Sequence, residues 1–447
     1  MNGVKIAKYV VSLVVLSGCL PDVSGDPPPG DKLIYPVGLS TTKNDEYLLV
    51  ANSNYDLRYN AGTLVAIDLD KLDSIREAGG KSDWQSKNGR QLYVPEEELI
   101  HEESTIRMDA FASDLELTPK GNRVLIPVRG GSERHILIVD VDEEKKNGRV
   151  LGCGEGDDLK CNGAHKVTSN DKVTLPIEPY EVAILDYEKQ LVDDEGNKAT
   201  ITSTIGFATH LYSGAVSSFM IENNEGKLDA ELLSVMGNVV PEASGIAVNS
   251  QNNEVYVSGR LNAEKYIAVL KVMYGGMGGT YTNDPIFGWT DKIEYSGDLY
   301  GGTDARGIAV SPSGKTAVVV TRTPSALLRI DTETREVVDM VSIGTDPSVV
   351  QIFEDEENGG VYAFILCFKS NNVYIVEPNT MKVYVRSTGS GPHAVAFDKK
   401  RKYAYIANFR ESTITIIEAT PPFNHVRVEG EDVQLMIGKP RLPDDHN

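Results

Sequence analysis

Short apolar runs alternate with turn residues along most of the chain, and their order repeats. Between residues 304 and 344, four runs rich in Val, Ile, Ala and Thr are separated by turns such as Pro-Ser-Gly and Asp-Thr-Glu-Thr. Runs of this length and composition are typical of β-strands. The same order of runs returns at residues 391–418. We therefore predict an all-β chain built from repeated units of about four strands.

Each repeat opens with Pro or Ala three positions before an apolar residue, and this pattern occurs seven times. The starts are Pro36, Ala112, Pro179, Ala243, Ala305, Pro347 and Pro392. The last two spacings, 42 and 45 residues, each fit one four-stranded propeller blade. The earlier spacings of 62 to 76 residues require insertions. We place these at residues 74–106 (with a helix-like stretch at 95–100), 153–161, 193–198 and 274–280, the last a flexible glycine-rich insertion.

Several repeats contain a Tyr-rich second strand: Tyr-Leu-Leu-Val-Ala-Asn at 47–52, Tyr-Val-Ser-Gly at 256–259 and Tyr-Ile-Ala-Asn at 405–408. With the Pro-x-x-Val-Ala strand and the Ser-Pro-Ser-Gly turn at 311–314, this resembles the YVTN type of β-propeller. The resemblance covers residues 33–440 and implies a single seven-bladed β-propeller of four-stranded blades. Because each unit runs from its first strand to its fourth, we expect blade 7 to pack on blade 1 without a swapped strand. Function is not implied, since such propellers include enzymes and binding modules.

The first 18 residues have the pattern of a targeting signal. Lys5 and Lys8 precede an apolar run at 9–16, which is too short to span a bilayer. The run ends in Leu-Ser-Gly-Cys, which resembles the bacterial lipobox, in which Cys19 would be acylated and become the mature N-terminus. The alternative is an ordinary secretory signal with a chance cysteine.

Residues 19–32 are polar and rich in Pro and Gly, so we interpret them as the lipidated cysteine and a tether. The propeller would occupy 33–440 and a tail 441–447. In lipoproteins of the enterobacterial type, Asp after the cysteine favours the inner membrane. Leu20 stands there instead, so we expect a cell-envelope protein anchored in the outer membrane rather than the inner one.

Charge and composition narrow the classes of partner. The 447 residues contain 44 Lys and Arg against 65 Asp and Glu, a formal charge of −21. Removing residues 1–18, which hold two lysines and no acid, makes it −23. A surface this acidic repels phosphate backbones, so we predict no nucleic-acid binding. Ordinary charged (24%) and hydrophobic (40%) fractions exclude wholesale disorder.

Three cysteines remain beyond Cys19. Cys153 and Cys161 bracket an acidic loop, where a disulfide suits an exported protein. The alternative is half of a metal site, but no second Cys/His pair lies at ligand spacing. Cys367 lies in an apolar strand and is predicted to be a buried free thiol.

Candidate binding residues occupy equivalent loop positions. Four blades have an acid before the start: Glu178, Glu242, Asp304 and Asp346. Five have a cation at the end of the second strand: Arg129, Arg260, Arg322, Lys369 and Arg410. Tyr180, Arg306 and His393 follow three of the starts. In propellers these loops meet at one end of the central channel.

Three interpretations of this end of the channel remain open. In the first, acids and bases form ion pairs that join adjacent blades. Alternatively, the polar residues form a pocket that binds an anionic group through arginine. The pocket would be lined by Arg129, Tyr180, Arg260, Arg306, Arg322, His393 and Arg410. In the third, the carboxylates of Glu178, Glu242, Asp304 and Asp346 hold a divalent ion, and oxygen ligands favour Ca²⁺.

No complete catalytic motif accompanies His393: the chain has neither G-x-S-x-G nor H-E-x-x-H. We therefore predict a lipid-anchored, extracytoplasmic, non-enzymatic binding or scaffold module without a cofactor. Its partners would be the membrane and a protein or other envelope component. The alternative is a lactonase- or esterase-like hydrolase with a carboxylate-held metal at the channel mouth. A weaker one is a redox-associated propeller subunit.

Overall fold

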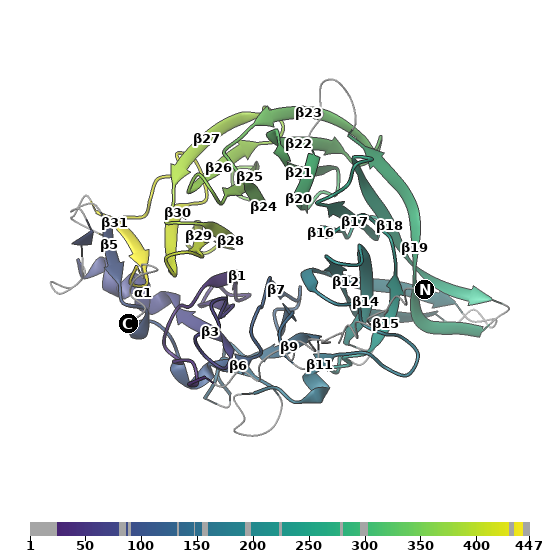
Figure 1. Cartoon of the computed structure of the whole chain (residues 1–447), viewed down its shortest axis with the longest axis horizontal. Helices are drawn as coiled ribbons and strands as arrows, with labels where there is room; N and C mark the ends of the chain where they lie inside the picture. The colour runs from purple at the N-terminus through teal and green to yellow at the C-terminus, as the bar shows by residue number, and fades with distance from the viewer. Residues whose placement is uncertain are drawn as a thin grey trace, which may run out of the picture.

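The predicted repeats form seven antiparallel sheets around a central axis, as the computed structural model shows (Figure 1). The structure describes residues 25–79, 86–87, 91–131, 134–146, 148–153, 160–192, 198–222, 226–277, 280–295, 303–428 and 433–440. The predicted signal, Cys19, the acidic residues 154–159 and the tail 441–447 lie outside these ranges. Within them, no helix combines the length and apolar character needed to cross a bilayer.

Each sheet is one blade, with its first strand innermost (Figure 1). The first strands are β1 (Pro36–Thr41), β7 (Glu116–Leu117), β12 (Pro179–Val192), β16 (Ala243–Asn249), β20 (Thr303–Val310), β24 (Pro347–Asp355) and β28 (Pro392–Asp398). The second strands are β2 (Tyr47–Asn52), β8 (Arg123–Val128), β13 (Lys198–His210), β17 (Glu254–Gly259), β21 (Thr316–Thr323), β25 (Gly360–Cys367) and β29 (Tyr403–Asn408). Five of the seven predicted starts are the first residue of a strand, and Ala305 lies within β20. Ala112 pairs with Val128 just before β7.

The outer strands complete the blades. The third strands are β3 (Gly62–Asp68), β9 (His135–Val141), β14 (Ala215–Glu222), β18 (Tyr266–Met277), β22 (Ser325–Asp331), β26 (Asn372–Glu377) and β30 (Thr413–Glu418). The fourth strands are β6 (Ile106–Met108), β10 (Leu151–Gly152), β15 (Leu232–Met236), β19 (Thr280–Glu294), β23 (Glu336–Ser342), β27 (Lys382–Ser387) and β31 (Gln434–Ile437). Blade 2 has a fifth strand, β11 (Lys166–Val167), which also pairs with β9.

Apolar side chains pack between blades, because a sheet with two apolar faces must cover both. Each of the seven junctions between neighbouring blades has its own buried cluster. Cys367 lies in the cluster between blades 5 and 6, where it is fully buried and free, as predicted. No blade could bury these faces alone, which explains why the repeats form one closed domain.

Strands flank or replace two of the predicted insertions. Residues 193–197, within the insertion predicted at 193–198, lie outside the described residues, and the flanking strands β12 and β13 pair as far as Val192 and Lys198. The Gly-rich stretch predicted to be flexible instead continues β18 to Met277, paired with β19 from Thr280. Glycine weakens a strand but does not prevent ladder hydrogen bonds, and here the partner strand supplies them. The predicted disulfide joins Cys153 and Cys161.

The insertion at 74–106 contributes to closing the ring. It begins within helix α1 (Leu69–Glu77), which the sequence pattern did not predict although the Asp68 side chain caps its Lys71 N–H at 2.8 Å. The insertion contains β4 (Ser86–Lys87), β5 (Gln91–Val94) and 3-10 turns at Glu96–Glu98 and Glu102–Ser104, the first within the stretch predicted as helix-like. A further 3-10 turn is Gly163–His165 in blade 2.

Blade 7 takes its four strands from the C-terminal part of the chain, as predicted. The prediction missed that β5 of the blade 1 insertion pairs in parallel with β31, so this sheet has six strands (Figure 1). The junction of blades 7 and 1 also holds a cluster of buried residues that includes Leu72 of α1 and Val94 and Leu99 of the insertion. The insertion therefore holds the last blade to the first.

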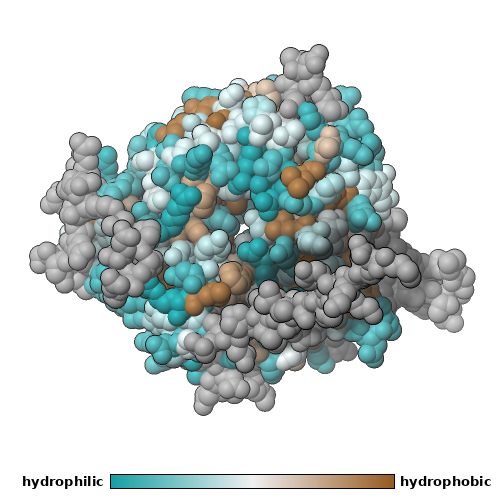
Figure 2. Space-filling view, viewed as in Figure 1, coloured by the Kyte–Doolittle hydropathy of each residue, from teal (hydrophilic) through white to brown (hydrophobic). Residues whose placement is uncertain are grey.

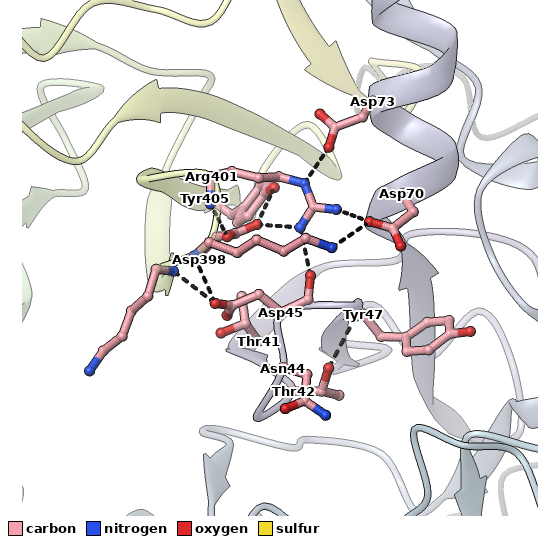
Figure 3. A network of polar contacts seen from close by, with 12 residues as sticks. Thr41, Thr42, Asn44, Asp45, Tyr47, Asp70, Asp73, Asp398, Arg401 and Tyr405 are labelled. Atoms are coloured by element: carbon pink, nitrogen blue, oxygen red, sulfur yellow. Dashed lines mark hydrogen bonds and ion pairs between the residues drawn. The ribbon is translucent and has the colours of Figure 1, made fainter.

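A polar network crosses the same junction (Figure 3). The Arg401 guanidinium, 6% exposed, lies 2.9 Å from Oδ2 of the fully buried Asp398 and 2.5 Å from Oδ2 of Asp73 in α1. It also contacts Asp70 of α1 and donates to the Asp45 carbonyl of blade 1 at 2.6 Å. One side chain of blade 7 thus joins two segments of blade 1.

The N-terminal described residues lie against blade 1. The Asn60 N–H donates to the Asp26 carbonyl at 3.1 Å, and the Thr105 hydroxyl donates to the Gly30 carbonyl at 2.7 Å. Pro28 is buried. Residues 25–32 were predicted as part of a tether too polar to pack; hydrogen bonds to their backbone carbonyls, which are available whatever the side chains, hold them against blade 1.

Candidate functional site

The aligned residue before each blade has a left-handed backbone in all seven repeats. The φ angles are 51° at Tyr35, 64° at Phe111, 54° at Glu178, 47° at Glu242, 59° at Asp304, 62° at Asp346 and 69° at Gly391. This conformation is uncommon outside glycine. In six of the blades the carbonyl of this residue accepts the N–H that follows the second strand, as in Arg260 to Glu242 at 3.1 Å. The turn thus places the side chains that surround one end of the channel.

We call this end, where the turns before the first strands meet the loops between second and third strands, the channel mouth. A register shift interrupts the pairing of first and second strands near their start in every blade. Such bulges turn side chains out of the normal alternation. Tyr180, Arg306 and His393 occupy these shifts, which explains why their side chains are placed at the mouth.

The first strands enclose a channel of about 480 Å³, lined by residues of all seven blades. Tyr180 and His393 are among the lining residues, together with backbone and small side chains. Figure 2 shows the opening at the centre of the ring, with hydrophobic residues beside it on a mostly hydrophilic face. A cavity of this size, with polar groups converging on it, is suited to a small ligand.

Three of the predicted arginines pair with predicted acids. Arg306 Nε lies 2.6 Å from Asp304 Oδ1, and its Nη2 donates to Oδ2 at 3.0 Å. Arg322 Nε lies 2.8 Å from Asp346 Oδ1, and Arg260 Nε lies 3.6 Å from Glu242 Oε2. Only the Arg322 pair joins two blades, so the inter-blade role predicted for such pairs is seen at one junction.

Arg129 and Arg410 have no carboxylate partner among the described residues and contact aromatic rings instead. The Arg129 guanidinium lies 5.8 Å from the Tyr180 ring centroid, and its Nε is buried without a hydrogen-bond partner in this part of the chain. The Arg410 guanidinium lies 4.6 Å from the Phe368 centroid. A buried donor without a partner costs free energy that a bound acceptor would offset.

The arginines of the mouth influence the pKa values of the same neighbouring side chains. The charges of Arg306, Arg129 and Arg260 oppose the rise that burial causes in the pKa of Tyr180. Burial lowers the pKa of Arg322, and the charge of Arg306 lowers it further. Arginines from blades 2, 4 and 5 therefore converge around Tyr180, as the pocket interpretation requires.

His393 is neutral at pH 7. Burial lowers its pKa to about 4, and the charges of Arg129 and Arg322 act in the same direction. Its Nδ1 lies 3.3 Å from the Val37 carbonyl oxygen, which can only accept, so Nδ1 carries the proton. Nε2 is then left as an acceptor. The side chain can orient a donor group of a ligand but brings no charge to bind an anion.

Aromatic rings line the other half of the mouth. Phe409 lies 5.1 Å from Tyr35, 5.5 Å from Tyr55 and 6.1 Å from Phe368, measured between ring centroids. These rings come from blades 7, 1 and 6. Sequence reasoning did not predict this cluster, although Tyr35 and Phe111 stand in the column where other blades have acids. The mouth thus has a cationic half, formed by blades 2 to 5, and an aromatic half, formed by blades 6, 7 and 1, in which Arg410 covers the Phe368 ring.

Three carboxyl groups line the channel below the mouth, and sequence reasoning gave them no role. Asp114 Oδ2 accepts from the Val182 N–H at 3.0 Å, and Glu181 Oε2 accepts from the Ile246 N–H at 3.3 Å, each across a blade junction. Burial raises the pKa of Asp114 to about 6 and that of Glu116 to about 8, the latter helped by the Asp114 charge. Burial and the Asp114 charge raise the pKa of Glu181 well above its usual range.

A pattern in the aligned repeats could have identified two of these acids. Asp114 and Glu181 occupy the second position after the blade start, which is glycine in blades 1, 4 and 5. At Gly245 a Cβ would lie 2.3 Å from the Arg306 carbonyl oxygen, because neighbouring backbones approach closely there. An acid in a column that is glycine in three other blades indicates a specific role across the junction.

Glu116 should make stability depend on pH. Its folded pKa is raised to about 8, so its favourable contribution is complete below the ordinary pKa near 4.3 and disappears as the pH rises through 8. Because the side chain is half-buried, we expect Glu116→Gln to stabilise the protein by roughly 1–2 kcal/mol at pH 8 and not at pH 4.5. Urea unfolding at both pH values tests this. Glu356→Gln, on an exposed turn, is the control; an equal gain there would contradict the prediction.

The structure does not bring together the four carboxylates predicted to hold a metal. Asp304, Asp346 and Glu242 each pair with an arginine, and Glu178 is exposed. Among the described residues, no three His, Cys, Asp or Glu side chains are grouped so that they could hold an ion. The donor set therefore does not fit the predicted Ca²⁺ site, because guanidinium groups occupy the oxygens that would bind it.

No family model matches the sequence, and no curated protein matches it either. Among solved structures, the fold is similar to hydrazine synthase of Kuenenia stuttgartiensis, with a TM-score of 0.53 and 11% identity over 92% of this chain and 99% of that one. A putative 6-phosphogluconolactonase of Bacteroides fragilis has a TM-score of 0.47 and 14% identity over 80% and 86%. A periplasmic gluconolactonase of Pseudomonas aeruginosa has 0.45 and 11% over the same shares. At these identities the likeness shows the propeller fold alone.

Proposed function

We propose that this β-propeller is a lipid-anchored, extracytoplasmic binding module that recognises an anionic group of its ligand at the channel mouth. The observation that carries the proposal is the convergence of arginines on Tyr180, with Arg129 unpaired among the described residues. Guanidinium groups bind carboxylate and phosphate through two parallel hydrogen bonds. The ligand's apolar or sugar face would contact the aromatic half of the mouth.

The ion pairs within the mouth support binding rather than compete with it. Asp304 holds Arg306 through two contacts, and Asp346 and the Pro347 carbonyl both hold Arg322 at Nε. Their guanidinium groups are therefore oriented before a ligand arrives, which lowers the entropy lost on binding. Arg129 supplies the uncompensated charge.

Replacing Arg129 or Arg306 by alanine should weaken binding of an anionic probe by about 10- to 100-fold, because a hydrogen bond to a charged group contributes about 1.5–3 kcal/mol. Calorimetric titration with inorganic phosphate, citrate and glucuronate measures this. Arg335→Ala, which removes an arginine from the opposite end of the ring, should leave affinity unchanged. Equal affinities for all variants, or no binding of any probe to the unaltered protein, would refute anion recognition.

A second candidate function is hydrolysis of an ester or lactone. The observation that favours it is the group of channel carboxyls with raised pKa, because a protonated carboxylic acid near neutral pH can act as a general acid. It differs from the metal-dependent hydrolase predicted from the sequence, whose ligands are not grouped in the described residues. Turnover of an aryl ester or lactone panel that disappears in Glu181→Gln, but persists in Arg335→Ala, would favour it over simple binding.

A further inference from the structure

We propose that the channel mouth faces the membrane and that its rim docks onto the headgroups of an anionic phospholipid surface. The inference rests on the lipid anchor of the proposed function and adds an orientation and a lipid contact to it. Three independent features carry it: the place where the chain leaves blade 1, the position of exposed apolar side chains, and the position of unpaired cations.

The N-terminal segment joins the propeller at the channel mouth. Asp26 forms a parallel bridge with Tyr59 in the loop between β2 and β3, which belongs to the rim of the mouth. Only six positions separate Cys19 from Gly25 in the sequence. Even fully extended, that stretch spans about 20 Å, less than the width of a domain of this size. An acyl group on Cys19 therefore holds this rim, rather than the opposite face, near the bilayer.

Exposed apolar side chains are concentrated on the same rim. Eight large hydrophobic residues are exposed among those that the structure describes, and five lie in loops at the mouth. These are Tyr55 (57% exposed), Leu57 (39%), Ile177 (38%), Tyr212 (78%) and Leu261 (68%). The other three lie on outer strands, and none lies in the described turns of the opposite face. Tyrosine and leucine projecting from loops are suited to the interface between headgroups and acyl chains.

Three cations without an acidic partner lie on the same rim. Arg129, Lys369 and Arg410 all follow second strands at the mouth and form no ion pair with any described residue. The chain carries −21, or −23 without residues 1–18, so an anionic bilayer would repel most of its surface. The rim also bears the exposed Glu178, and its three unpaired cations are the groups that such a bilayer attracts. Charge and apolar exposure thus favour the same orientation as the anchor.

Spin labels on the anchored full-length protein test this orientation. Tyr212→Cys and Leu261→Cys are labelled in separate proteins reconstituted in vesicles of phosphatidylcholine with phosphatidylglycerol. The native cysteines do not interfere, because Cys367 is buried and Cys153 is bonded to Cys161. We expect both labels to collide more with oxygen than with a water-soluble nickel chelate. Glu356→Cys on the opposite face and Val385→Cys on an outer strand should show the reverse.

Each alternative result has a definite meaning. If the protein is recovered with the vesicles but labels at 212 and 261 are as water-accessible as that at 356, the docking inference is wrong while the anchor stands. If the protein does not remain with the vesicles, the anchor itself fails. If the labels at 212 and 261 are shielded from water only in native envelopes, and not in pure lipid vesicles, the rim contacts a protein and the inference is overturned. In vesicles of phosphatidylcholine alone, or after Lys369→Gln with Arg410→Gln, the oxygen preference should decrease.

Discussion

Replacing Arg401 by alanine should lower the free energy of unfolding by about 3–5 kcal/mol, because it leaves the buried Asp398 carboxylate without its counter-ion. Asp398 is fully buried and Arg401 is 6% exposed, so water cannot take the place of the missing guanidinium. The variant also loses contacts to Asp73 in α1 and to the Asp45 carbonyl. Since these join blade 7 to blade 1, we expect the ring to open at this junction first. Equilibrium urea unfolding measures the change.

Two further variants test whether the loss of stability comes from the ion network or from removing any side chain of this turn. Lys400→Ala on the same turn removes an exposed ion pair to Asp70 and should cost about 0–1 kcal/mol. Combining Arg401→Met with Asp398→Asn removes both charges and should restore much of the stability lost in Arg401→Ala. A loss in Arg401→Ala no larger than in Lys400→Ala would show that the network does not hold the ring closed.

Substituting Cys19 by alanine should move the protein from the membrane fraction to the soluble fraction. Each buried methylene group of an acyl chain contributes about 0.8 kcal/mol, so several chains on one cysteine anchor a protein firmly and their loss releases it. The exposed rim side chains place much less apolar surface in the bilayer than several acyl chains do, so we expect them not to hold the protein alone. Fractionation after a high-salt wash, followed by immunoblotting, measures the redistribution.

Cys367→Ala is the matched control for this change. It removes the other unpaired thiol, which is buried between blades 5 and 6, and should leave the protein with the membrane. Tight association of Cys19→Ala with washed membranes would show that the lipobox interpretation is wrong. Release of both variants would indicate unfolding rather than loss of an anchor, which thermal unfolding of the soluble fraction would detect.

The candidate site was partly predictable because it is built from equivalent positions of a repeat. Aligning the blades is enough to place Arg306, Arg322 and His393 at one end of the channel, and the structure puts them there, within the ends of β20, β21 and β28 rather than in loops. The alignment cannot tell which arginines remain unpaired. Arg306 is held by Asp304 two residues away, whereas Arg129 lies over Tyr180 of the next blade, a contact that depends on how the blades are angled.

The channel carboxyls show a second limit. Glu181 follows Tyr180 directly, so its neighbour was identified as a site residue while it was not. Its role depends on the bulge that turns both residues out of the strand alternation and on the Ile246 N–H of the adjacent blade. The Ile246 N–H is 65 residues away in the sequence. A carboxylate in a strand is normally interpreted as facing water.

The sequence by itself determined the seven repeats and the strands within them, because a period of two and recurring turn residues are local properties that survive in any context. It also determined the disulfide and the buried thiol. The targeting signal stays a prediction. Only the tertiary structure decided how the ring closes, since the parallel pairing of β5 with β31 joins segments more than 340 residues apart. It likewise decided which charges neutralise one another and which face the chain leaves from, because these depend on distances between blades that no single repeat contains.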